Sequence, residues 1–301
     1  MSVAELSSRP AIRCRLIEAV DVPAVVRLLE APFPDRSADY WNRGFARLSE
    51  RDLPDGVPRF GYVLERSGEL IAVLLTIYST ISDGSSTSLR CNLSTWYVLP
   101  EYRALSTILD GLAMRDRSVT YINISAAPHT VAMHEARGFR CYCRGQMLVL
   151  AALSPPRWRQ HVYRIEEKDD VDVPEHLRDL VRDHRGYGCT CLLCHDGSRT
   201  EVVILRRLSL KLRRRWIRLP RLPAFQVVYG PVGKDLSRWL GAIGRYLLLN
   251  GAPPFLLFGV NERLAGVVGC HLRNSGRRYV RGSATVSVGD LSYTEVTIFG
   301  P

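Results

Sequence analysis

The sequence has no apolar run long enough to cross a membrane as a helix, which takes about 18 to 20 consecutive apolar residues. The longest candidate, YLLLNGAPPFLLFGV at 246–260, is interrupted by Asn-Gly-Ala-Pro-Pro and instead predicts a helix end, a turn and a strand. The first residues, MSVAELSSRPAIRCRL, lack the apolar core of a secretory signal peptide. We therefore expect a cytoplasmic protein.

The sequence also has no second C-x-x-C pair, which limits what its eight cysteines can do. Without a secretion signal, thiols are expected rather than a disulfide framework. Cys191-Leu192-Leu193-Cys194-His195 matches the C-x-x-C-H pattern of c-type haem attachment, but covalent haem belongs to exported proteins. Zinc sites of this kind draw ligands from two separated pairs, and strand alternation would separate Cys189 and Cys191 from Cys194. We expect a plain strand here and no bound metal.

A surplus of positive charge, +11 over 301 residues, suggests an anionic partner such as nucleic acid, anionic lipid or the phosphates of CoA. The densest basic stretch has no acid within it, and no recognised nucleic-acid-binding motif accompanies it. It is either a solvated connector or a contact with an anionic membrane surface, and we do not expect nucleic acid as a partner. Its basic residues are Arg206, Arg207, Lys211, Arg213, Arg214, Arg215, Arg218 and Arg221.

The hydrophobic pattern of the first half predicts a mixed α/β unit. The 46% hydrophobic content argues for packed cores. A hairpin is expected to turn at Ser67-Gly68. Strands are predicted at 12–17, 61–68, 69–81, 91–98, 119–125 and 140–153, and helices after Asp21, at 36–50, at 104–116 and before Gly138.

The second half follows a proline-containing linker at Ser154-Pro155-Pro156. It again shows strand, helix and strand in succession, which suggests a degenerate repeat of the first half. We therefore expect two domains, 9–153 and 157–301. The predicted helices are 174–185 and 235–251, and the predicted strands are 189–197, 200–210, 224–230, 254–260, 277–284 and 292–300.

One segment, 91–139, carries a specific resemblance. The apolar run CNLSTWYVL ends at Pro100-Glu101-Tyr102-Arg103, an amphipathic segment and a second apolar run follow, and another helical pattern closes with Gly138-Phe139. Such a turn aims backbone amides at an anion. This order resembles the GNAT superfamily of acyl-CoA-dependent N-acyltransferases. The resemblance implies a GNAT-like N-terminal domain with acyl-CoA as co-substrate, an amine as acceptor, and a degenerate GNAT-like C-terminal domain.

In that superfamily a sequence Q/R-x-x-G-x-G/A gives its amides to the pyrophosphate of CoA. Arg103 matches its first position, whereas Ser106 and Ile108 stand where the family has small residues. Glycine there lets a phosphate approach the backbone closely. The positions that the resemblance places against acyl-CoA are Val98, Arg103, Ala104, Leu105, Ser106, Thr107 and Asn123.

The superfamily commonly has a tyrosine acid four residues before the glycine of Gly-Phe, and His134 holds that position. An imidazole can protonate the departing thiolate, although His134 also fits a polar surface residue. No side chain stands out as the general base. Two further classes stay open: a non-catalytic binding or scaffold protein, and a peripheral membrane acyltransferase acting on a lipid or glycan precursor.

Overall fold

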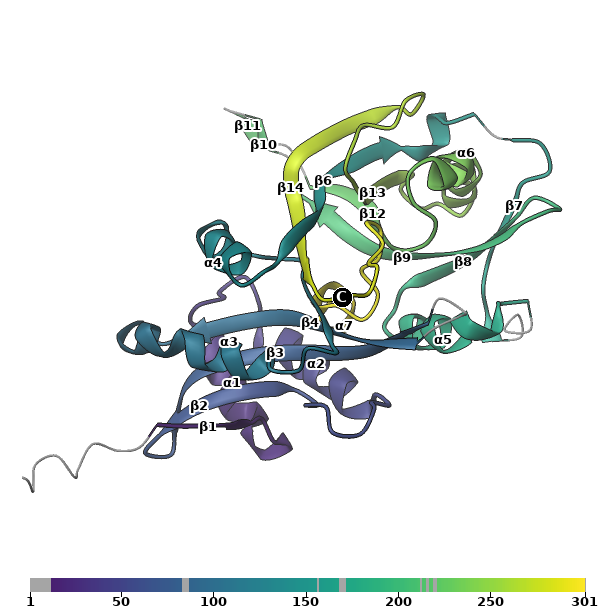
Figure 1. Cartoon of the computed structure of the whole chain (residues 1–301). Coiled ribbons are helices and arrows are strands. Elements are labelled where there is room, and N and C mark those ends of the chain that lie inside the picture. The colour runs from purple at the N-terminus through teal and green to yellow at the C-terminus, as the bar shows by residue number, and fades with distance from the viewer. Residues whose placement is uncertain are drawn as a thin grey trace, which may run out of the picture. The chain divides into compact units, whose positions relative to one another are not determined.

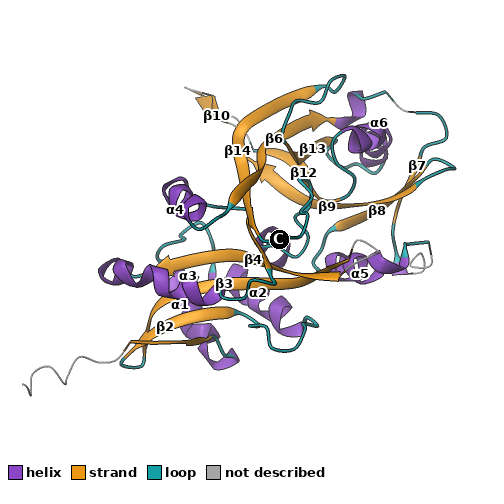
Figure 2. Ribbon diagram, in the orientation of Figure 1, coloured by secondary structure: helices purple, strands orange, loops and turns teal. Residues whose placement is uncertain are grey.

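A computed structural model describes residues 12–82, 87–155, 157–167, 172–211, 213–214, 217–218 and 221–300 (Figure 1). The chain forms two compact units. Unit 1 comprises the described residues up to 123 together with 281–283 and 293–300, and unit 2 comprises those in 124–280 and 284–292. Both units contain helices and strands (Figure 2).

Unit 1 contains a sheet in the order β1-β2-β3-β4-β5. All neighbours are antiparallel except β4 and β5, which are parallel. Ser67 and Gly68 have φ values of 52° and 84°, so the predicted hairpin turn is confirmed. The strands are β1 (Ile12–Leu16), β2 (Gly61–Arg66), β3 (Glu69–Ser82), β4 (Thr87–Val98) and β5 (Thr120–Asn123).

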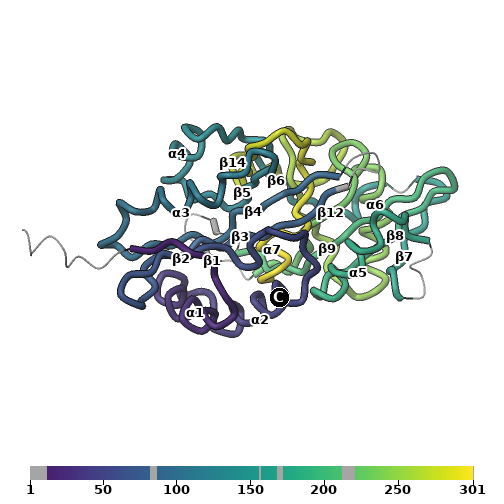
Figure 3. The backbone as a smooth tube through the Cα atoms, turned by 60° about the horizontal axis from the view of Figure 1, so that its bottom comes forward, coloured from purple at the N-terminus to yellow at the C-terminus, as the bar shows by residue number. Residues whose placement is uncertain are grey.

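Helices cover both faces of this sheet. Figure 3 shows α1 (Val22–Glu30) and α2 (Ala38–Glu50) on one face and α3 (Ser106–Ala113) on the other. The α2 helix begins where the Ser37 hydroxyl accepts a hydrogen bond from the Tyr40 amide, 3.3 Å away. Its buried side chains, including Trp41, Phe45 and Leu48, recur at helical spacing, which is why this helix is readable from the sequence.

The prediction of a strand at 292–300 is wrong, because this segment contains a short helix, α7 (Glu295–Ile298). Its β-branched residues favour a strand by propensity. However, the side chains of Thr294 and Thr297 form a reciprocal capping box that starts the helix. The Arg47 guanidinium then donates to the carbonyl oxygens of Thr297, Ile298 and Gly300 at 3.0 to 3.2 Å.

Unit 2 contains a sheet in the order β14-β6-β13-β12-β9-β8-β7. Its core joins the strands β6, β8, β9, β12 and β13 to the apolar face of α6 (Lys234–Leu249), which presents Trp239, Leu240 and Ile243. The other elements are α4 (Val131–Ala136), β6 (Arg140–Leu150), β7 (His161–Arg164), α5 (Arg178–Gly186), β8 (Thr190–His195), β9 (Thr200–Leu210), β10 (Arg213–Arg214), β11 (Ile217–Arg218), β12 (Leu222–Tyr229), β13 (Phe255–Val260) and β14 (Gly269–Arg281).

The two units share an order of connections. In unit 1 four successive antiparallel strands lead into the parallel pair β4 and β5, joined through α3. In unit 2 the strands β7, β8, β9 and β12 are antiparallel neighbours in the sheet, with the short pair β10 and β11 between β9 and β12 in the chain, and β12 leads through α6 to the parallel strand β13. No helix within the described ranges is long and apolar enough to span a membrane.

Candidate functional site

The strands β4 and β5 part before β4 ends. Their parallel pairing runs from Arg90 opposite Thr120 to Asn92 opposite Ile122. Leu93 and Trp96 to Val98 continue to pair with β3, whereas no described residue pairs with the segment 93–98 on the β5 side. Unpaired strand edges present a row of backbone N–H and C=O groups that an extended ligand can meet.

A bulge lies in this unpaired part of β4. Leu74 pairs with Trp96 and Thr76 with Leu93, so two residues of β4, Ser94 and Thr95, face one residue of β3. A bulge bends its strand and redirects the side chains that follow. It therefore interrupts the regular alternation of side chains between the two faces of β4. The hydroxyl of Ser94 and the indole N–H of Trp96 are buried without a hydrogen-bond partner among the described residues.

The turn after β4 is a 3₁₀ helix, η3 (Pro100–Leu105), that runs directly into α3. A 3₁₀ helix bonds each amide to the carbonyl three residues earlier, and the Ser106 amide donates to the Arg103 carbonyl in this way. The Ser106 amide is thereby occupied, and the Tyr102 amide donates to the Leu99 carbonyl at 2.9 Å. Among the side chains of this turn that could meet a phosphate, those of Arg103 and Thr107 are exposed whereas Ser106 is half-buried.

Tyr102 holds this turn against the hairpin of β2 and β3. Its hydroxyl accepts a hydrogen bond from the Arg66 guanidinium at 2.6 Å, and the same guanidinium lies 5.5 Å from the centre of the Tyr102 ring. The predicted CoA positions Val98, Arg103 to Thr107 and Asn123 thus lie on β4, the turn, α3 and the end of β5, all within unit 1.

His134, the predicted proton donor, lies in α4 of unit 2 and is 2% exposed. Its ring packs edge-on against Phe139, with centroids 5.2 Å apart. The Phe139 amide donates to the His134 carbonyl oxygen, while Gly138 takes a φ of 84°. Burial lowers the pKa of the imidazole, so the neutral ring is favoured at pH 7. His134 is therefore a buried residue and not a surface polar one.

A cation surrounded by aromatic rings was not anticipated from the sequence. The Arg36 guanidinium lies 5.1 Å from the ring centre of Phe33, 5.3 Å from that of Tyr40 and 5.2 Å from that of Trp41. It also donates to the Thr95 hydroxyl in the β4 bulge at 3.5 Å. The aromatic residues around Arg36 were visible in the sequence, but nothing there indicated the contact with β4.

A buried acid also reaches β4. The amide nitrogen of Asn92 donates to the carboxylate of Glu295 in α7, and both side chains are buried. Asn92 is the last β4 residue that pairs with β5. An acid therefore lies beside the point where the two strands part.

The C-x-x-C-H segment is the strand β8, as predicted, and it pairs with β7 and β9. Cys191 and Cys194 are buried, and burial raises the pKa of Cys191 to about 12. No group of metal-ligating side chains occurs within the described part of the chain. Within the basic run, β10 and β11 pair as a two-stranded sheet, while Arg215 lies outside the described residues. The membrane contact through Arg206 to Arg221 stays a prediction.

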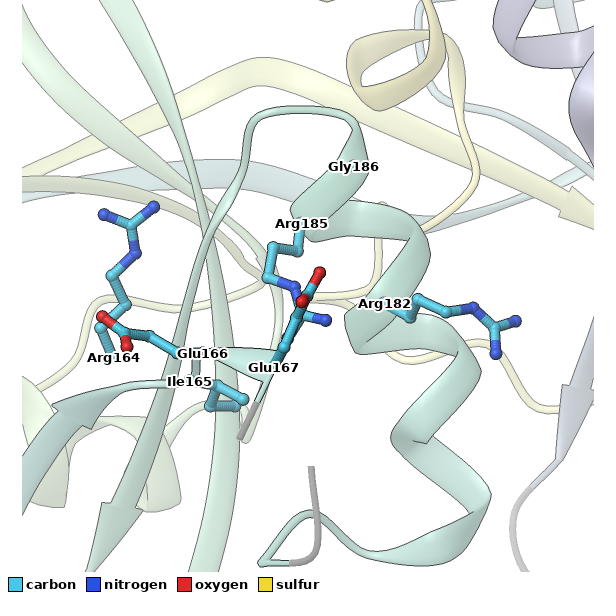
Figure 4. A pocket seen from close by; sticks show the side chains of 7 residues that line it. All are labelled: Arg164, Ile165, Glu166, Glu167, Arg182, Arg185 and Gly186. Atoms are coloured by element: carbon cyan, nitrogen blue, oxygen red, sulfur yellow. The ribbon is translucent and has the colours of Figure 1, made fainter. Parts of the chain in front are cut away.

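A pocket of about 880 Å³ lies in unit 2 between the end of β7 and the C-terminal part of α5 (Figure 4). Its lining mixes both signs of charge, and none of the predicted site residues takes part in it. The lining residues are Arg164, Ile165, Glu166, Glu167, Arg182, Arg185 and Gly186.

The fold is similar to that of several proteins of known structure. No protein-family model and no curated protein matches the sequence. A GCN5-related N-acetyltransferase from Anabaena variabilis is similar in structure, with a TM-score of 0.58 at 9% identity over 90% of this chain and 72% of the other. A GCN5-related N-acetyltransferase from Kribbella flavida has a TM-score of 0.54 at 14% identity over 91% and 71%.

A third similar structure is the GCN5-related glucosamine N-acetyltransferase region of a fungal multi-domain β-N-acetylglucosaminidase. Its TM-score is 0.56 at 12% identity, covering 91% of this chain and 38% of that longer protein. Each alignment spans most of the present chain, and therefore more than the segment that carries the sequence resemblance. The chain has the GNAT fold, as its sequence predicted.

Proposed function

We propose that this protein transfers an acyl group from acyl-CoA to an amine. The observation that carries the proposal is the unpaired edge of β4 from Leu93 to Val98, within a GNAT fold. An acyl-pantetheine arm is extended and rich in amides, so it can hydrogen-bond to such an edge as an added strand would. The amine attacks the thioester carbonyl carbon, the C–S bond breaks, the amine loses a proton and the thiolate gains one.

In this proposal the pyrophosphate meets side chains at the turn, where η3 already uses the Ser106 amide. The guanidinium of Arg103 supplies charge, and the hydroxyls of Ser106 and Thr107 supply neutral donors. Val98 and Asn123 flank the arm from β4 and β5. His134 would protonate the thiolate through the small imidazolium fraction that its lowered pKa allows.

The same features support one alternative, a binding or scaffold protein that has lost acyl-CoA. Ser106 and Ile108 replace the small residues of the superfamily pattern, and the Ser106 amide is used within η3. In this alternative the protein has the GNAT fold but does not bind acyl-CoA. Calorimetric titration with CoA and acyl-CoA separates the two: saturable binding that Arg103→Ala weakens supports the enzyme, and absence of any binding supports the scaffold.

The shared order of connections in the two units supports a tandem origin, with 9–153 and 157–301 as the two GNAT-like parts. The turn between β12 and α6 in unit 2 corresponds in position to η3. It carries Gly230 and Gly233, and Gly233 takes a φ of 59° with open space around it. Titration of CoA into Gly233→Val beside Arg103→Ala tests which of the two turns a phosphate uses.

A further inference from the structure

We propose that Arg36 binds an acidic group, a carboxylate or a phosphate, carried by the amine that accepts the acyl group. This inference rests on the proposed acyltransferase function and names the class of its acceptor. The starting observation is that the Arg36 side chain is half-buried and that no carboxylate among the described residues forms an ion pair with it.

Three aromatic rings lie around the Arg36 guanidinium. Three ring centres, those of Phe33, Tyr40 and Trp41, lie between 5.1 and 5.3 Å from its central carbon. Cation–π contacts of this kind hold a guanidinium in place without taking up its N–H donors. Arg36 is therefore positioned in advance, which lowers the entropy lost when it binds a ligand.

Nearly all of the donors of Arg36 are available. A guanidinium has five N–H donors, and the one side-chain hydrogen bond it makes among the described residues is the 3.5 Å contact with Thr95. No carboxylate of the described chain lies within ion-pair distance of it; the neighbouring Asp35 and Asp39 are exposed and make no such pair. A carboxylate or phosphate matches the free fork of the guanidinium with two parallel bonds.

The position of Arg36 argues against a role in helix stability. It comes directly before Ser37, the N-cap of α2. A cation at the N-terminal end of a helix opposes the helix dipole, and the same dipole attracts an anion. Arg36 and the N-terminus of α2 thus both favour an anionic ligand at the same position.

The contact with Thr95 places Arg36 near the edge of β4 that is proposed to bind the thioester. Thr95 lies in the β4 bulge, three residues beyond Asn92, where pairing with β5 ends. Three residues of a strand span roughly 10 Å. An acid bound by Arg36 would therefore lie beside the β4 edge that is proposed to hold the thioester, on the face covered by α1 and α2 (Figure 3). An acceptor that carries both an amine and an acid can bridge this distance.

The test compares amines that differ in their acidic group: phenylalanine with phenethylamine, and glucosamine 6-phosphate with glucosamine. Release of free CoA is followed for wild type, Arg36→Gln, Arg36→Lys and the control Arg43→Gln, which removes an exposed charge from α2. We expect kcat/KM to favour at least one acidic amine by about 10- to 100-fold in wild type, as for a charged hydrogen-bonded pair.

The preference should fall to about one in Arg36→Gln, be partly kept in Arg36→Lys and persist in Arg43→Gln, while the neutral amines and the acyl-CoA Kd stay unchanged. An equal preference in wild type and Arg36→Gln, or a preference for neutral amines, would overturn the proposal. If no amine reacts, the acyltransferase function fails, and direct titration of the acidic amines still tests Arg36. Absence of Arg36-dependent binding then overturns its role as well.

Discussion

The ring of Phe299 occupies the space in which a side chain at Gly44 would lie. A Cβ added at Gly44 would overlap the ring carbons of Phe299. The ring also packs on Tyr40, Trp41 and Phe45, with centroids 5.6 to 6.0 Å apart. This contact joins the segment 293–300 to α2 within unit 1.

Gly44→Ala should therefore lower the free energy of unfolding by about 1–3 kcal/mol, the usual cost of overpacking a core. Denaturant unfolding measures this. Gly111→Ala in α3 is the control, because its Cβ meets nothing within 4 Å and alanine favours a helix. Equal stability of the two variants would contradict the packing described for Phe299.

Replacing Arg47 should destabilise α7. Arg47→Met deletes the donor to three carbonyl oxygens in and after that helix, so we expect a loss of about 1.5–3 kcal/mol in unfolding free energy. Arg43→Met, an exposed change in the same helix, should have almost no effect. Faster hydrogen exchange at 295–299 in Arg47→Met, without a change in β3, would locate the effect, and unchanged exchange there would argue against it.

The buried imidazole of His134 should make stability depend on pH. Its pKa in the folded protein is lowered from about 6.5, so the unfolded chain binds the proton more tightly. This contribution is present above about pH 6.5 and is lost as the pH falls through the lower, folded-state value. Unfolding curves from pH 7.5 to 5 should show a decline that His134→Leu reduces and His129→Gln, an exposed change in the preceding 3₁₀ turn, does not.

Much of the fold was predictable because its signals are local. Apolar runs and turn residues predict β2 through β4, and the spacing of Trp41, Phe45 and Leu48 predicts α2. The contacts that make the site were not predictable, since Arg36 and Thr95 are 59 residues apart and Asn92 and Glu295 are 203 apart. The strand prediction for 292–300 was wrong because its β-branched residues favour a strand, whereas capping and burial stabilise a helix there.

Restoring glycine at the turn should strengthen CoA binding if the missing small residues weaken it. In the double variant Ser106→Gly with Ile108→Gly we expect a lower Kd for CoA and a stability loss of about 0.5 kcal/mol per change, because glycine disfavours helix. Leu112→Gly, later in α3, controls for flexibility alone. A Kd that stays the same in the double variant would show that glycine at these positions is not what limits binding.

The most direct test of the central claim is isothermal titration calorimetry with CoA and with acetyl-, butyryl- and palmitoyl-CoA, on wild type and Arg103→Ala. We expect saturable binding of at least one thioester by wild type and binding weakened about tenfold or more in the variant, as when a charged hydrogen bond to phosphate is lost. No binding of any thioester by the folded wild-type protein would contradict it and leave a GNAT fold without its co-substrate.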